Sequence, residues 1–277
     1  IMAEEQRHGW QMAYLLMTYF GQQGRREAQK LLERNAQDGD RLLGAFNRPM
    51  PHWLDFFCYT MFVDRDGKFQ LGMLSTSAFK PLAASMGPML KEESFHLGTG
   101  SNGLRRIIKA GVIPLDMLQR YINKWVSTAH DLFGVDESSS AHWAYVWGIK
   151  GRWDERKKLE GDVEVSKETL NEEARQHYHE EIVREVKKLC GYLPEGAADL
   201  YVPHENFHRE IGHFKRQRYT VEGTLFEGSD DEWDAYMAAH LPTAQDEEDL
   251  KELFKQQWVA EKPMTARQIA SGIGASA

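Results

Sequence analysis

Cysteine is almost absent from this 277-residue sequence. The two cysteines, Cys58 and Cys190, have neither the CxxC spacing of redox motifs nor the spacing of zinc ligands. We therefore expect buried, reduced thiols in a cytoplasmic protein rather than a disulfide framework.

Long apolar runs and an excess of positive charge are also missing. No run reaches the roughly 18 apolar residues that a membrane span requires. Lys and Arg number 34 against 42 Asp and Glu, which gives a formal net charge of −8. Because a nucleic-acid-binding protein needs a basic face to neutralise phosphates, this charge predicts no binding to nucleic acid. The lack of a long apolar run predicts no insertion into a membrane. Charged, helix-like sequence begins directly after Ile1 and Met2, so we expect the true N-terminus to lie upstream.

What is present is enough apolar sequence, 42%, for a substantial core, together with 11% aromatic residues. Apolar patterning and the positions of Pro and Gly predict helices in the segments 3–21, 24–43, 49–79, 81–100, 112–134, 166–191, 229–241 and 244–259. We expect interruptions at 65–67 and 87–88, a cap at Ser166, and a short strand over 218–226. The sequence thus predicts an all-α core over 1–134 and an irregular, mostly helical extension over 135–277.

The pentad Glu-Glu-x-x-His occurs twice, at Glu4–His8 and at Glu92–His96. Residues three apart on a helix share a face, so the carboxylate and imidazole of Glu-x-x-His can reach one ion. A di-metal bundle uses two such motifs and one carboxylate from each of two further helices. Hard oxygen ligands with one nitrogen per metal suit iron or manganese. The doubled acids leave open whether Glu4 or Glu5, and Glu92 or Glu93, is the ligand.

Asp64 lies inside an otherwise apolar segment, where a buried carboxylate needs a partner. A metal ion would be such a partner, and pairing with Arg65 is the structural alternative. Asp55 is the weaker competitor for the same role. One more carboxylate, on a helix before Glu5, would complete the bundle, which fits the expected upstream segment.

Two further motif matches favour a simpler interpretation. Glu205-x-x-His208 and Glu210-x-x-His213 follow Pro203 in a segment that reads as a loop, so we expect surface side chains. Gly98–Gly103 matches Gly-x-Gly-x-x-Gly, but it follows a helix rather than a strand. A dinucleotide site is therefore excluded, and we expect these glycines to loosen the backbone beside the metal.

Several stretches resemble the oxygenase components of benzoyl-CoA 2,3-epoxidases, which are ferritin-like di-iron monooxygenases related to the catalytic subunit of phenylacetyl-CoA epoxidase. The resemblance runs over nearly the whole chain, and its most specific stretch is "AHWAYVWGIKGRWDE". It implies a ferritin-like four-helix core whose first ligand helix is missing from this sequence. The family ligands that it carries over are Glu5, His8, Asp64, Glu93 and His96.

The resemblance also implies a function. The chain would bind two iron ions, with Glu5 and Glu93 bridging or chelating them, and would use O2 to epoxidise the ring of benzoyl-CoA at the 2,3 position. Electrons would come from a separate flavin or iron–sulfur reductase, so NADPH would act only through that partner. Candidates for contact with the CoA ester are Arg105, Arg106, Trp143, Tyr145, Trp147 and Trp153. Solvated arginines and core aromatics are the alternative interpretations of these residues.

Three other functions stay open. The first is an epoxidase for a related aryl-CoA, such as phenylacetyl-CoA. The second is a ferritin-like protein that binds or oxidises iron without an organic substrate, for which the aromatic segment would be unnecessary. The third is a non-catalytic helical binding module with the pentads as surface charge.

Overall fold

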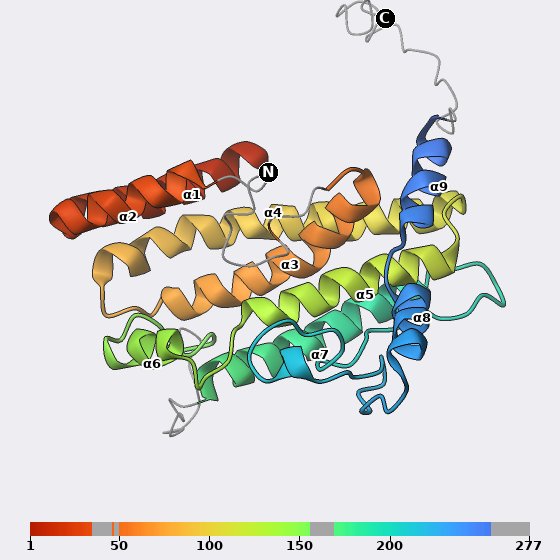
Figure 1. The fold of residues 1–277 in the computed structure, drawn as a ribbon. Coiled ribbons are helices and arrows are strands. Elements are labelled where there is room, and N and C mark those ends of the chain that lie inside the picture. The colour runs from red at the N-terminus through yellow and green to blue at the C-terminus, as the bar shows by residue number, and fades with distance from the viewer. Residues whose placement is uncertain (35–45, 47–49, 156–168, 256–277) are drawn as a thin grey trace, which may run out of the picture. The chain divides into compact units, whose positions relative to one another are not determined.

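The structure is a computed structural model that describes residues 1–34, 46, 50–155 and 169–255, and the side chains of these up to residue 253. The chain divides into two compact units, Ile1–Pro242 and Thr243–Ala277. The helices of the first unit are α1 (Met2–Tyr19), α2 (Gly21–Glu33), α3 (Trp53–Leu74), α4 (Lys80–Ala110), α5 (Leu115–Leu132), α6 (Ser139–Val146), α7 (Leu170–Cys190) and α8 (Asp230–His240) (Figure 1). The second unit contributes α9 (Ala244–Lys255). The all-α prediction is confirmed.

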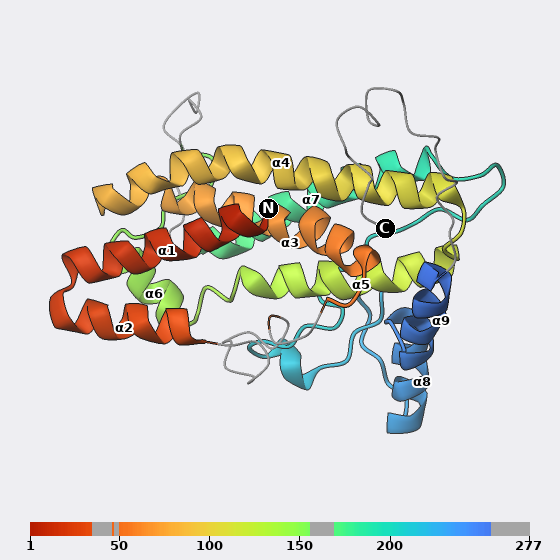
Figure 2. The same cartoon turned by 90° about the horizontal axis from the view of Figure 1, so that it is seen from above.

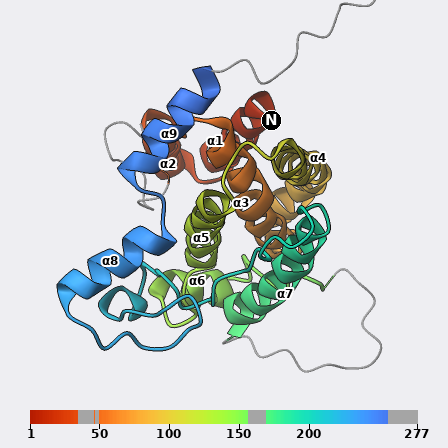
Figure 3. The same ribbon diagram turned by 90° about the vertical axis from the view of Figure 1, so that its right-hand side faces the viewer.

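Helix α3 lies at the centre of the bundle, where it packs against α4, α5 and α7 (Figure 3). Its sequence is apolar on nearly every side, and the burial of Leu54, Phe62 and Met73 follows from that composition. The helix continues through the interruption expected at 65–67, where two side chains have partners within the fold. Arg65, for example, is bound to Glu181 of α7. That prediction was wrong.

Helix α4 contains the Gly98–Gly103 stretch in its regular interior, so the loosening of the backbone expected at these glycines is not found. A Cβ on Gly100 would lie 2.5 Å from the backbone nitrogen of Met61 on α3, and one on Gly103 would collide with the ring of Phe57. The two glycines therefore permit close approach of α3 and α4. The helix also runs through Gly87 and Pro88, where an interruption was expected.

Helix α1 runs alongside α4 in the opposite direction, and α2 folds back against α1 (Figures 1 and 2). At one end of α1 the rings of Tyr19 and Phe20 lie 5.2 and 5.7 Å from that of Phe79, which precedes α4. Ala13 is the single fully buried side chain of α1. The contacts at its other end are those of the candidate site.

The extension beyond α5 is mostly helical and irregular, as predicted. In place of the strand expected over 218–226, the described residues show an isolated antiparallel bridge between Tyr219 and Leu225. Helix α7 ends at Gly191 as expected, whereas the cap expected at Ser166 falls outside the described residues. None of the helices in the described part of the chain has the length and apolarity to cross a membrane.

Candidate metal centre

The two Glu-Glu-x-x-His pentads lie side by side on α1 and α4. Glu4 Oε2 is 2.9 Å from His96 Nε2, and Glu92 Oε2 is 2.7 Å from His8 Nε2. Moving four residues toward the C-terminus on α1, from Glu4 to His8, therefore corresponds to moving four residues toward the N-terminus on α4, from His96 to Glu92. The pentads therefore face each other across antiparallel helices, and the first acid of each contacts the histidine of the other.

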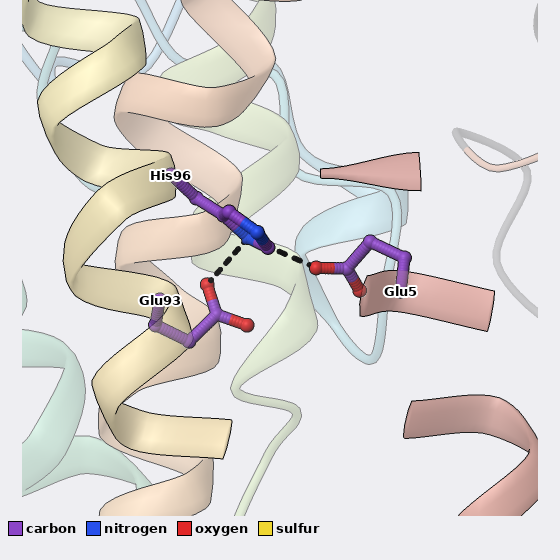
Figure 4. Close-up of side chains that lie close together, drawn as sticks. All are labelled: Glu5, Glu93 and His96. Atoms are coloured by element: carbon purple, nitrogen blue, oxygen red, sulfur yellow. Dashed lines mark ion pairs between the residues drawn. The ribbon is translucent and has the colours of Figure 1, made fainter. Parts of the chain in front are cut away.

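The second acid of each pentad, Glu5 or Glu93, faces Nδ1 of His96. Ligand atoms of Glu5, Glu93 and His96 all lie within 4.8 Å of one another. His96 Nδ1 is 3.0 Å from Glu5 Oε1 and 3.5 Å from Glu93 Oε2, and all three side chains point toward one another (Figure 4). Asp64 comes from the central helix α3, and its Oδ2 lies 3.8 Å from the same nitrogen. Glu5 and Glu93 are 88 residues apart in the sequence and Asp64 and Glu93 are 29 apart, and the packing of α1 and α3 on α4 brings them together.

Three buried polar atoms of this cluster have no hydrogen-bond partner among the described residues, namely Asp64 Oδ2, Glu93 Oε2 and His96 Nδ1. His96 is fully buried, and Glu93 and Asp64 are 6% and 8% exposed. Buried polar atoms normally have a partner, since leaving one unsatisfied costs about 1–3 kcal/mol. Both carboxylate oxygens lie within 3.8 Å of the imidazole nitrogen, an arrangement that fits a divalent cation such as iron or manganese.

Burial and mutual repulsion raise the pKa values of the inner carboxyls. The pKa of Asp64 rises to about 9, first because the group is desolvated and then because of the charges of Glu93 and Glu5. Desolvation, followed by the charge of Glu5, raises the pKa of Glu93 to about 8. The hydrogen bond with His96 instead lowers the pKa of Glu4 to about 2. The pocket therefore disfavours negative charge unless a cation is present.

Glu5 is placed between the two histidines. Its Oε1 faces His96 Nδ1, and its Oε2 lies 3.6 Å from Nδ1 of His8. Both imidazoles thus direct Nδ1 toward Glu5, while each Nε2 contacts the opposite leading acid. Glu5 is also the exposed member of the group, since its side chain is 48% accessible.

Asp55, the competing aspartate, has a complete set of partners elsewhere. Its Oδ1 accepts hydrogen bonds from Lys124 Nζ at 2.7 Å and from Trp125 Nε1 at 2.9 Å, and His52 Nε2 lies 3.3 Å from Oδ2. Asp64 has no such set. The alternative in which Asp64 pairs with Arg65 receives no support either, because Arg65 is bound to Glu181.

Reasoning from sequence missed two features of the centre. The leading acids Glu4 and Glu92 were recognised only as alternative ligands, whereas they contact the histidine on the opposite helix. Tyr59 of α3 was not considered; burial and then the charges of Asp64 and Glu5 raise its pKa, and its ring packs 5.2 Å from that of Trp125. The doubled Glu was the available signal for the first feature, and the sequence carries no clear signal for the second.

The other motif matches lie outside the α-helices. His208 has a positive φ of 49° in the loop after Pro203, and Glu205 lies 3.6 Å from Nε of Arg175. His208 and Glu210 approach each other at 3.8 Å. A Glu-x-x-His face requires helical spacing, which is missing here, in agreement with the surface interpretation.

The candidates for CoA contacts divide into two groups. Trp143 on α6 and Trp147 directly after it are 55% and 69% exposed, and Tyr145 between them is half-buried. Trp153, in contrast, packs its ring 4.9 Å from Phe69 and 5.0 Å from His177, as a core aromatic would.

The two arginines proposed for CoA contacts lie near the end of α4, about 14 to 15 Å of helix beyond His96. The Arg105 guanidinium lies 5.8 Å from the ring of Tyr192, and Arg106 is exposed. The exposed Arg106 has the character of a solvated helix arginine.

Most of this chain matches a known protein family. The family described as "Phenylacetic acid catabolic protein" matches residues 8–222, which include four of the five predicted ligands. The chain belongs to this family. The resemblance inferred from the sequence is confirmed.

Two relatives of this chain have names that state a function. The chain is 37% identical to benzoyl-CoA oxygenase component B of Aromatoleum evansii over 289 aligned positions, which cover 89% of the chain and 61% of the relative. It is 26% identical to one of the subunits of 1,2-phenylacetyl-CoA epoxidase from Escherichia coli (strain K12) over 176 positions, 63% of the chain and 51% of the relative. The chain therefore spans between half and two thirds of the length of these relatives.

Proposed function

We propose that this protein is the oxygenase component of an aryl-CoA epoxidase, that it holds two iron ions, and that its substrate is benzoyl-CoA. The observation that carries the proposal is the convergence of ligand atoms of Glu5, Glu93 and His96, with the buried Asp64 Oδ2 3.8 Å from His96 Nδ1, in a member of this family. The greater identity to a benzoyl-CoA oxygenase component than to a phenylacetyl-CoA epoxidase favours the benzoyl thioester.

The residues of the chain would hold the ions in the following way. Glu93, His96 and Asp64 would surround one ion and His8 would bind the other, while Glu5 would offer one oxygen to each. This assignment is supported by the positions of the two Glu5 oxygens, 3.0 Å from Nδ1 of His96 and 3.6 Å from Nδ1 of His8. The chemistry that bound iron supplies is the activation of O2.

Glu4 and Glu92 would orient the two imidazoles. Each accepts the Nε2–H of one histidine, which leaves the lone pair on Nδ1 directed at the centre. Arg7 also binds Glu92 and helps to keep that carboxylate ionised. The burial of His96, Asp64 and Glu93 would exclude bulk water from the reacting atoms.

The proposed reaction places one atom of O2 across the 2,3 bond of the benzoyl ring. The other atom leaves as water after uptake of two electrons and two protons. We expect the electrons from a separate flavin or iron–sulfur reductase, which itself oxidises NADPH. The word "component" in the name of the first relative supports a system of several proteins, and a cytoplasmic location stays a prediction.

The exposed rings of Trp143 and Trp147 favour a role in contact with the CoA ester or with a partner over a role as core filler. Trp153 is better explained by packing. For Arg105, Arg106 and Tyr145, contact with the CoA ester stays a prediction.

The test has two stages. Iron per folded chain is measured after anaerobic loading with ferrous ion and desalting, for the parent protein and for Glu93→Gln. Thermal unfolding with benzoyl-CoA and with phenylacetyl-CoA follows, and then turnover with a reductase. We expect about two irons per parent chain, a clear loss in the variant, and a larger thermal shift with benzoyl-CoA.

The possible results separate the alternatives. Absence of iron from a folded parent chain would overturn the di-iron proposal and leave the binding module. Iron without any response to either thioester would support a protein that binds or oxidises iron only. A larger response to phenylacetyl-CoA would replace the proposed substrate.

A further inference from the structure

Two glycines of α4 lie on the same face of the helix as two of the metal ligands. Glu93, His96, Gly100 and Gly103 are spaced by three, four and three residues, so they follow one seam along the helix. All four are buried. Gly98 lies outside this seam, and a Cβ added there would meet nothing within 4 Å. The Gly98–Gly103 stretch therefore contains two kinds of glycine, and only those in the seam pack against a neighbour.

The seam of α4 faces a matching seam on α3. Three pairs of residues face each other across it, namely His96 with Asp64, Gly100 with Thr60, and Gly103 with Phe57. From pair to pair, α4 advances by four and then three residues while α3 goes back by the same numbers. The glycine pairs thus lie about one and two helical turns beyond the ligand pair in one antiparallel register. The separation of the two helices affects all three pairs together.

At Gly100 the backbones of the two helices are closely apposed. A Cβ added there would lie 2.5 Å from the nitrogen of Met61 and 2.8 Å from its Cα, whereas ordinary van der Waals contact begins at 3.4 Å. Because the atoms it would meet are backbone atoms, they cannot turn aside as a side chain can. An alanine at Gly100 would therefore push α3 and α4 apart by about 1 Å in this region.

Asp64 is a short side chain for its place in the centre. In ferritin-like di-iron bundles, the helices that supply a single carboxylate supply a Glu. Asp is shorter by one carbon–carbon bond, about 1.5 Å, so it reaches the centre only from a helix that approaches more closely. Metal–ligand distances vary by only about 0.2 Å, and a displacement of about 1 Å would take the Asp64 carboxylate out of reach.

We propose that Gly100 and Gly103 are positioning residues of the metal centre, matched to the short side chain of Asp64. They set the separation of α3 and α4 at which this carboxylate reaches an ion held by His96 and Glu93. This role rests on the proposed function, in which the cluster binds iron. The contacts that support it all join α3 to α4.

Anaerobic equilibrium dialysis of the 277-residue chain against ferrous ion tests this role. Gly100→Ala is compared with Gly98→Ala, which adds the same methyl group on the same helix where it meets nothing. Asp64→Glu is made alone and together with Gly100→Ala, because the longer side chain can span the widened gap. Thermal unfolding of each metal-free protein shows that it is folded and measures the loss of stability separately.

We expect Gly100→Ala to lower the affinity for ferrous ion by at least about 10-fold, since even the loss of an outer-shell partner costs about 10- to 100-fold. Gly98→Ala should leave the affinity unchanged. Asp64→Glu should lower the affinity of the parent chain and raise that of Gly100→Ala. Such a reversal of sign requires that side-chain length and helix separation act together, and a role in packing alone would not produce it.

Gly103→Ala gives a second test if Gly100→Ala does not fold. Its methyl group would lie 2.2 Å from the ring of Phe57, which is a side chain rather than backbone. Replacement of that ring in Gly103→Ala/Phe57→Leu relieves the collision. We expect the affinity for ferrous ion to fall in Gly103→Ala and to recover in the double variant.

Three results would overturn the positioning role while leaving the metal centre and the proposed function in place. They are unchanged affinity in folded Gly100→Ala or Gly103→Ala, an equal loss of affinity in Gly98→Ala, and a further loss when Asp64→Glu is added to Gly100→Ala. Each would show that the glycines serve packing alone. Failure of the folded parent chain to bind ferrous ion would overturn the proposed function as well.

Discussion

Glu92 lies 2.7 Å from Nε2 of His8, although 84 residues separate them and they belong to different helices. Glu4 and His96 repeat the same contact at 2.9 Å, with the roles of the helices exchanged. The presence of a leading acid in each pentad is therefore explained by its contact with the histidine of the other pentad. Such carboxylate–imidazole contacts fix which ring nitrogen carries the proton and raise the basicity of the other.

Replacement of Glu92 by Gln tests this role. We expect ferrous-ion affinity to fall about 10-fold or more, because the neutral amide no longer increases the electron density on the His8 ring. Equilibrium dialysis measures the change, and Glu195→Gln, at an exposed position, is the control. Unchanged affinity in a folded Glu92→Gln protein would contradict an orienting role.

The stability of the metal-free protein should depend on pH through Asp64. Its pKa in the folded state is about 9, whereas the unfolded chain has the ordinary value near 3.8. Between these values the folded state binds a proton that the unfolded state does not, so stability falls as pH rises. Asp64→Asn removes this cost. We therefore expect the free energy of unfolding of the variant, relative to that of the parent, to rise by at least about 1 kcal/mol between pH 5 and pH 8.

Urea denaturation of the metal-free parent and Asp64→Asn proteins at pH 5, 6.5 and 8 measures this difference. Glu195→Gln serves again as the reference, because an exposed carboxyl should give a difference that is nearly independent of pH. A constant gap between parent and Asp64→Asn across the range would rule out the raised pKa.

Asp55 and Asp64 should respond to the same substitution in opposite ways. Asp55→Asn breaks a buried pair with Lys124 and should cost about 3–5 kcal/mol of unfolding free energy. The affinity for iron should stay within about twofold of the parent value, which is a small change in binding free energy. Loss of iron binding in a folded Asp55→Asn protein would show that the wrong aspartate was assigned to the centre.

Gly100 and Gly98, on the same helix, offer a matched pair. A methyl group at Gly100 would meet the backbone of Met61, so Gly100→Ala should destabilise the protein by about 1–3 kcal/mol. Nothing lies within 4 Å of a Cβ at Gly98, and Gly98→Ala should stabilise the helix by about 0.5–1 kcal/mol. Chemical denaturation of both variants measures their free energies of unfolding. Equal effects of the two substitutions would argue against close packing of α3 on α4.

The helices and the inner acids could be predicted from the sequence because both depend on the pattern of nearby residues. Apolar periodicity placed α3, α4 and α5, and the spacing of Glu5 with His8 and of Glu93 with His96 identified one face on each of two helices. The continuity of α4 through Pro88 was not accessible, because it depends on packing around buried Met86 and Met89 rather than on local propensity. The partners of Glu4 and Glu92 were equally out of reach, since they depend on the register between two antiparallel helices.

Helix α1 buries only Ala13 completely, yet it supplies Glu5 and His8 to the centre. Its attachment to α4 relies on charged contacts around the pentads and on the aromatic contact with Phe79 at its other end. A helix with so little buried surface is among the first elements to open in a folded protein. Bound metal would tie α1 to α4 directly, and loss of metal would undock a helix as well as remove a cofactor. Under the proposed function, the supply of iron would then control the local order of this protein as well as its chemistry.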